Sequence, residues 1–183
     1  MNFLITGNMR SRTAWFATFM NHAGVFCYHE ALSSCDILED IDSMRRGNLW
    51  GNSDSSALFF LEDLMKMYPK MKVVVIVRDV HEVIESLNRF MPKTEYSERI
   101  NACLADELDD CIKKLDKSRV LVVSYKRIDK DIKKIWKYCL PNKSFNKKWY
   151  DFLKDMKIEH KYSDNPKYGN LLLNRVEEAL WQS

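Results

Sequence analysis

Apolar residues along the chain form short continuous runs, separated by longer segments in which they recur every three or four positions. Four runs have the length and apolar character of strands, namely Asn2–Thr6, Val25–Tyr28, Lys72–Val77 and Arg119–Ser124. The third contains VVVIV, which is typical of a strand that is buried on both faces of a parallel sheet.

The segments between these strands have helical periodicity. Thr13–His22 places four large apolar side chains on one face, and Gly24 follows as a stop signal. Asp79 and Glu82 form a capping box that opens a helix running to about Phe90. Further helices are predicted over Ser55–Met67, Glu95–Leu115, Asp129–Tyr138, Lys147–Asp155 and Asn170–Trp181.

Strands that alternate with helices predict an α/β fold, a parallel sheet flanked by helices on both faces. No repeat or linker interrupts residues 1–183, so a single domain is expected. Ligands of such sheets bind beyond the carboxyl ends of the strands. The candidate residues are therefore those directly after each strand: 7–13, His29-Glu30, Arg78-Asp79 and Tyr125.

Composition narrows the class of protein further. The chain is 46% hydrophobic and 30% charged, as ordinary globular proteins are. No apolar stretch approaches the ~20 residues that a membrane-spanning helix needs. Residues 3–5 are too short an apolar run for a signal peptide, so a cytoplasmic location is expected. The five cysteines and four histidines show no ligand spacing, and no metal site is predicted.

The net charge of +3 is unevenly distributed along the chain. Residues 1–112 hold 11 Lys+Arg against 17 Asp+Glu, a net of −6, and residues 113–161 hold 16 against 6, a net of +10. A basic half attracts anions. Since no recognition motif accompanies the charge, nucleic-acid binding is not expected, and the lysines are interpreted as solvated helix faces.

The sequence GNMRSRT at residues 7–13 joins the first strand to the first helix. Backbone N–H groups at a helix start form an anion site, to which Ser11 and Thr13 add hydroxyls and Arg10 and Arg12 add charge. The ATP-binding pattern G-x-x-x-x-G-K-[ST] is not matched, because Arg12 and Thr13 occupy the positions of its second glycine and its lysine.

Four stretches resemble sulfotransferases that use 3'-phosphoadenosine 5'-phosphosulfate (PAPS). RSRTAW at residues 10–15 is similar to the family's [KR]-S-G-T-T-W loop, with arginine for glycine and alanine for threonine. VVVIVRDVHEVIESLNRF resembles the 3'-phosphate motif, with Arg78 and Ser86 eight residues apart. LVVSYKRI, which contains Tyr125, resembles the strand that ends near the adenine. CYHE at residues 27–30 ends in Glu30, at the position where bacterial members present an acidic base.

The resemblance implies a P-loop-like α/β fold and a set of roles. The donor's 5'-phosphosulfate would rest on the loop, including Ser11, Arg12 and Thr13, with Arg10 stabilising charge on the leaving phosphate. Arg78 and Ser86 would hold the 3'-phosphate, and Trp15 and Tyr125 would contact the adenine or serve packing.

An acceptor must lose a proton during transfer, so a base is needed. Glu30 is the first candidate, and His29 is its neighbour. Asp54 is a distant third, within a stretch at residues 49–54 that we expect to line the acceptor side. The family's C-terminal R-K-G-x-x-G signature is absent, and Lys161, Lys167 or Gly169 are the possible substitutes.

Three functions remain open from the sequence. The leading one is a PAPS-dependent sulfotransferase that releases 3'-phosphoadenosine 5'-phosphate (PAP). The alternatives are a nucleotide or small-molecule kinase on the same scaffold, and a non-catalytic nucleotide-binding module. The sequence does not determine the oligomeric state or the acceptor, a small molecule or carbohydrate with a hydroxyl or amine. A lipid headgroup and a peptide tyrosine are also open.

Overall fold

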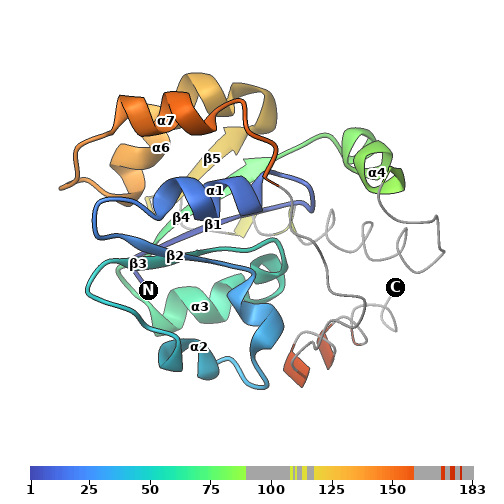
Figure 1. Ribbon diagram of the computed structural model, residues 1–183. Coiled ribbons are helices and arrows are strands. Elements are labelled where there is room, and N and C mark those ends of the chain that lie inside the picture. The colour runs from blue at the N-terminus through green and yellow to red at the C-terminus, as the bar shows by residue number, and fades with distance from the viewer. Residues whose placement is uncertain are drawn as a thin grey trace.

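The fold is built on a five-stranded parallel sheet. The computed structural model describes residues 1–89, 108, 110, 113–114, 118–158, 170–171, 174–175 and 178. The strands are β1 (Phe3–Gly7), β2 (Phe26–His29), β3 (Trp50–Ser53), β4 (Lys72–Val77) and β5 (Val120–Ser124). Their order across the sheet is β2-β3-β1-β4-β5, and every neighbouring pair is parallel (Figure 1). The predicted fold class is therefore confirmed.

Strand β3 was not predicted. Its sequence WGNS carries no run of β-branched residues, yet it pairs with β1 on one side and with β2 on the other. Gly51 makes the pairing possible, because a Cβ at this position would lie 2.4 Å from the ring of Phe3. All four residues of β3 are buried, and the expectation that residues 49–54 line the acceptor side stays a prediction.

Two apolar cores lie on opposite faces of the sheet. Alternate strand residues supply them: Leu4, Val73 and Val75 belong to one core, and Phe3, Ile5, Val74 and Ile76 to the other. This period of two is the one that a sheet buried on both faces requires.

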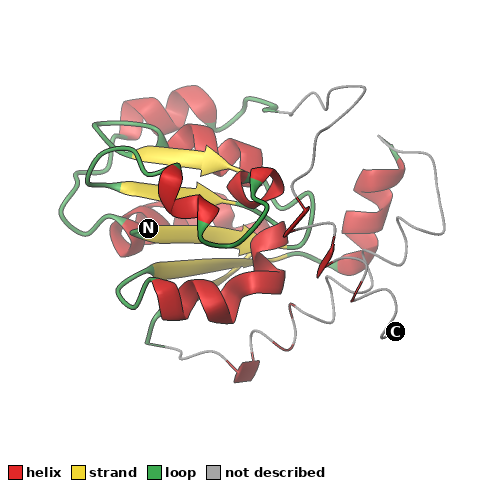
Figure 2. Cartoon of the chain, turned by 90° about the horizontal axis from the view of Figure 1, so that it is seen from below, coloured by secondary structure: helices red, strands yellow, loops and turns green. Residues whose placement is uncertain are grey.

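Helices cover both faces of the sheet (Figures 1 and 2). The first core is closed by α2 (Asp40–Ser43), the 3₁₀ turns η1 (Ala31–Ser34) and η2 (Ser56–Phe60), and α3 (Leu61–Met67). The second core is closed by α1 (Thr13–Met20), α6 (Ile128–Cys139) and α7 (Lys147–Leu153). The helix predicted over Ser55–Met67 is thus a 3₁₀ turn followed by an α-helix. The helices predicted over Glu95–Leu115 and Asn170–Trp181 lie largely outside the described residues.

Helix α4 (Val80–Asn88) extends beyond the carboxyl end of the sheet (Figure 1). The Asp79 side chain accepts hydrogen bonds from the backbone N–H groups of His81 and Glu82, so the predicted N-cap is confirmed. The 3₁₀ turn η3 (Tyr125–Arg127) follows β5 at the same end. This end of the molecule carries the residues that the sequence selects.

Candidate functional site

The loop between β1 and α1 begins at a close approach of two strands. A Cβ on Gly7 would lie 2.2 Å from the carbonyl oxygen of Ile76 in β4, so only glycine fits there. Arg10 and Arg12 have φ of 63° and 67°, in the left-handed region. That conformation costs a non-glycine residue about 1–2 kcal/mol. The loop is therefore held in a shape that arginine does not favour, and Arg12 stands where the resembling family has glycine.

The start of α1 is open to an anion. Arg12 occupies the N-cap position and its side chain makes no capping hydrogen bond. The Ser11 hydroxyl is fully buried and finds no hydrogen-bond partner among the residues that the structure describes. Uncapped amides together with a buried hydroxyl donor fit a phosphate or sulfate oxygen. By contrast, Asp79 caps the start of α4.

Arg78 joins the loop to the ends of two strands. Its Nη1 donates a hydrogen bond to the backbone carbonyl of Arg10, and its guanidinium carbon lies 4.2 Å from the centroid of the Tyr125 ring. The Arg10 side chain donates from Nε to the Ser86 hydroxyl over 3.2 Å. Four residues that the sequence selects from three separate stretches are therefore neighbours in the fold.

A cavity of about 460 Å³ lies beside Arg78 and Tyr125. Its lining includes Asn8 from the β1–α1 loop, Glu82 from α4 and Lys126 from η3. Glu82 Oε1 is 2.7 Å from Lys126 Nζ, and Glu82 Oε2 is 3.8 Å from Arg78 Nε. Sequence reasoning did not single out Glu82 or Lys126 for this site, although both are close in sequence to residues that it did select.

Glu30 and His29 lie at the carboxyl end of β2, near the loop. His29 Nε2 is 3.4 Å from the Thr13 hydroxyl and 3.6 Å from Glu30 Oε1. Burial, and secondarily the charge of Asp54, raise the pKa of Glu30 from 4.5 to about 7. A carboxylate with a pKa close to physiological pH can accept a proton and later release it.

The Asp54 carboxylate accepts hydrogen bonds from several neighbouring segments of the chain. It is fully buried, and its two oxygens accept hydrogen bonds from the N–H groups of Leu32 and Ser56, the Asn52 amide and the Ser56 hydroxyl. These four hydrogen bonds connect Asp54 to the segment after β2, to β3 and to the start of η2. Asp54 therefore has a structural role in this fold, and its role as a third candidate base stays a prediction.

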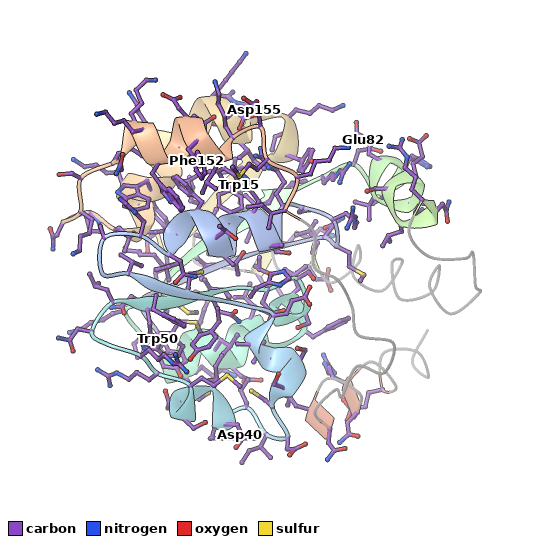
Figure 3. All side chains as sticks on the ribbon, viewed as in Figure 1. Trp15, Asp40, Trp50, Glu82, Phe152 and Asp155 are labelled. Atoms are coloured by element: carbon purple, nitrogen blue, oxygen red, sulfur yellow. The ribbon has the colours of Figure 1, made fainter. Side chains whose placement is uncertain are left out.

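Trp15 is a core residue in this structure (Figure 3). Only 2% of it is exposed, its indole N–H donates to the Leu153 carbonyl, and its ring stacks on Phe19. The guanidinium of Arg12 lies 4.3 Å from the ring centroid and is held by Asp129 at 3.1 Å. Packing accounts for this tryptophan, and contact with an adenine stays a prediction.

Three other predictions concern the C-terminal signature, a metal site and a membrane-spanning helix. Lys161, Lys167 and Gly169, the possible substitutes for the C-terminal signature, lie outside the described residues. Within the described part of the chain, no group of three or more His, Cys, Asp and Glu side chains could hold a metal ion. Nor does any described helix have the length and apolar character needed to cross a membrane.

The sequence matches the family described as Sulfotransferase domain over residues 38–161, more than half of the chain. This stretch contains Arg78, Ser86 and Tyr125, whereas the β1–α1 loop and Glu30 precede it. No curated protein matches the chain significantly.

Solved structures of low sequence identity share the fold. A mouse sulfotransferase, SULT7A1 complexed with PAP, matches with a TM-score of 0.61 and 17% identity over 83% of this chain, which spans 62% of the mouse chain. A sulfotransferase from Alicyclobacillus acidocaldarius has a TM-score of 0.51 and 11% identity, over 83% of this chain and 89% of its own. The sulfotransferase domain from the curacin biosynthetic pathway has a TM-score of 0.58 and 12% identity, over 96% of both chains.

Proposed function

This chain belongs to the sulfotransferase family, and from that premise we propose that it transfers the sulfuryl group of PAPS to a hydroxyl or amine acceptor. The observation that carries the proposal is the convergence of Arg10, Arg78 and Ser86 beside an uncapped helix start. One anion site suits a 5'-phosphosulfate, and a second, built on Arg78, suits a 3'-phosphate. ADP and ATP have no group for the second site.

The loop holds and orients the donor in this proposal. The first amides of α1 and the Ser11 hydroxyl contact its 5' end, and both are fixed before binding by the fold. The donor supplies an activated sulfuryl group, and PAP is the leaving group. Preorganised donors at the leaving phosphate lower the barrier because they need no rearrangement as charge develops.

Arg10 and Arg78 each stabilise a different part of the negative charge of the donor. Both guanidinium groups stay charged at neutral pH, so neither acts as a general acid. Arg10 reaches the Ser86 hydroxyl from the loop, and in this proposal its positive charge lies between the two anion sites. Arg78 is oriented by the Arg10 carbonyl and the Tyr125 ring, so its fork is set to meet the 3'-phosphate.

Glu30 acts as the base. As the acceptor oxygen or nitrogen bonds to sulfur, its proton passes to the Glu30 carboxylate, and the bond between sulfur and the bridging oxygen breaks toward PAP. The pKa of about 7 leaves a large share of Glu30 ionised at neutral pH while keeping it basic enough to take the proton. His29, 3.6 Å from Glu30, positions that carboxylate or takes the same proton.

Calorimetric titration tests the donor assignment. The purified protein is titrated with PAP and separately with ADP, and both titrations are repeated with Arg78→Ala. Losing a charge-assisted contact worth ~1.5–3 kcal/mol should weaken PAP about 10- to 150-fold and leave ADP nearly unchanged. Arg127→Ala is the matched control, because that exposed arginine pairs with Asp131 and does not line the cavity.

Two outcomes would contradict the proposal. Equal affinity of the wild-type protein for PAP and ADP would favour the kinase alternative. Selective PAP binding without sulfuryl transfer to any of a panel of phenols, alcohols, sugars and amines would favour a non-catalytic nucleotide-binding module.

A further inference from the structure

The carboxylate of Glu82 lies between two cations in the cavity, Arg78 and Lys126. Glu82 is 2.7 Å from Lys126 Nζ through one oxygen and 3.8 Å from Arg78 Nε through the other. All three residues line the same 460 Å³ cavity. The two cations come from different elements, β4's end and η3, and the carboxylate comes from α4. The fold thus brings together two positive charges with an anion between them.

The contact between Glu82 and Arg78 leaves one N–H of the guanidinium, at Nε, without a hydrogen bond within the described part of the chain. A separation of 3.8 Å is too long for a hydrogen bond, and the buried Arg78 Nε has no hydrogen-bond acceptor among the described residues. The orientation of Arg78 does not depend on Glu82, because the Arg10 carbonyl and the Tyr125 ring already hold the guanidinium. Arg78 can therefore bind an anion that pairs with it more closely than Glu82 does, and it keeps its position when Glu82 is displaced.

The start of α4 offers few free N–H groups to an anion in this cavity. Its N–H groups at His81 and Glu82 already donate to the Asp79 side chain. Side-chain cations are the strongest remaining partners for a phosphate here, and Lys126 joins Arg78 in the lining. The Lys126 side chain is 73% exposed, so it can turn from Glu82 toward a bound group at little cost.

We propose that Lys126 is the second cation of the 3'-phosphate subsite, and that Glu82 is an internal counterion which the phosphate displaces. The inference rests on the proposed function, because it presumes a 3'-phosphorylated nucleotide as ligand. A phosphate with close to two negative charges gains more from two cations than the single charge of Glu82 does. Lys126 then supplies a positive charge from η3 in a chain whose sequence lacks the C-terminal R-K-G-x-x-G signature.

Substitutions of Lys126 and of Glu82 should change the affinity for PAP in opposite directions. Lys126→Met removes a cation from the subsite and weakens PAP. Glu82→Gln removes a negative charge that the phosphate would otherwise face, and it releases both cations, so it tightens PAP. Asp79 is the other carboxylate of the lining, and it remains engaged with the α4 amides in both variants.

Titration of four proteins with PAP and ADP tests the proposal. We expect Lys126→Met to weaken PAP roughly five- to tenfold, between the effect of an exposed ion pair and that of a charge-assisted hydrogen bond. Glu82→Gln should tighten PAP by roughly the same factor. ADP affinity should stay within about twofold of the wild-type value in every variant. Lys134→Met is the matched control, an exposed lysine of α6 outside the cavity lining, and it should leave PAP binding unchanged.

The readouts separate the two proposals. If wild-type protein does not prefer PAP over ADP, the proposed function fails and the subsite fails with it. If wild-type protein prefers PAP but Lys126→Met binds it as wild type does, the donor assignment stands and the role of Lys126 is overturned. Weaker PAP binding by Glu82→Gln would overturn the counterion role, since it would mean that Glu82 positions Arg78 for the ligand. Thermal unfolding of each variant confirms that the proteins compared are folded.

Discussion

At the scale of single residues, burial sets the chemistry of Glu30. Its pKa rises to about 7 because the fold withdraws the carboxyl from water and places it near the charge of Asp54. A raised carboxyl pKa means that the folded state binds the proton more tightly than the unfolded state. Stability is then greatest below pH 4.5 as far as this group is concerned, and it falls as the pH rises toward and through about 7.

Glu30→Gln should therefore separate activity from stability. We expect sulfuryl transfer to drop by roughly 10²- to 10⁴-fold, the usual contribution of a general base, and the limb of the pH–rate profile near pH 7 to disappear. The free energy of unfolding at pH 8 should rise by about 1–3 kcal/mol, because no buried carboxyl has to ionise. Denaturant titrations at pH 4.5 and pH 8 measure this. A variant that is equally active, or less stable than wild type at pH 8, would refute the assignment.

Asp54 differs from Glu30 although both are acidic residues that follow neighbouring strands. It is fully buried, but four hydrogen-bond donors meet its carboxylate. Asp54→Ala should lower the free energy of unfolding by about 3 kcal/mol or more, because donors such as the Leu32 N–H are left unpaired. Asp54→Asn keeps one acceptor oxygen and should cost less.

The Asn variant also tests the division of roles between the two acids. Removing the charge of Asp54 lowers the pKa of Glu30, so the rising limb of the pH–rate profile should move below pH 7 while the maximal rate stays within about tenfold. A well-folded Asp54→Asn protein that loses more than about a hundredfold in rate would make Asp54 the base instead.

At the scale of elements, the β1–α1 loop is shaped by the pairing of β1 with β4. Gly7 and Ile76 are partners in that ladder, and the space between them has no room for a side chain. The helix start that follows is left uncapped, while Asp79 caps the start of α4. The local sequence predicted both features, because a glycine after an apolar strand and an acid three residues before another acid are signals along the chain.

Gly7→Ala should lower the free energy of unfolding by roughly 3–5 kcal/mol, because the new Cβ forces β1 away from β4. Gly24→Ala is the matched control, with φ of 78° and no atom within 4 Å of the added Cβ. Its cost should be only the ~1 kcal/mol of the left-handed conformation. Urea denaturation of both proteins gives the comparison, and similar losses in the two variants would show that backbone conformation rather than the close approach requires Gly7.

Strand β3 could not be predicted from its local sequence. WGNS has neither strong alternation nor a β-branched run, and it is a strand because β1 and β2 offer it hydrogen bonds on both edges. The sequence pattern therefore predicts no strand here, only a stretch on the acceptor side. The same strand carries Asn52, whose side chain contacts both Ala31 and Asp54 and so ties the end of β2 to the end of β3.

At the scale of the whole molecule, one sheet joins the two cores. Strand residues alternate between them, so neither core can form without the sheet that the other also needs. The site draws on the ends of β1, β4 and β5 and on α4. Binding at this site should therefore stabilise the folded chain as a unit.

PAP at about 100 times its dissociation constant should raise the free energy of unfolding by ~2.7 kcal/mol in a single transition. Arg78→Ala at the same PAP concentration should show a much smaller increase, because its affinity is lower. Two transitions, with only one of them sensitive to PAP, would mean that the two cores unfold separately.

The sequence by itself determined the alternation of strands and helices, the open loop at residues 7–13 and the identity of most candidate residues. Each of these features depends on residues that are neighbours in the chain. Only the tertiary structure decided which candidates meet. Arg10 and Ser86 are 76 positions apart in the chain and in contact in the fold. Asp54 accepts hydrogen bonds from backbone and side-chain donors of other segments, and Glu82 lies between Arg78 and Lys126. Burial, pKa and charge pairing depend on what surrounds a group in space, and a parallel sheet brings together residues that the chain keeps far apart.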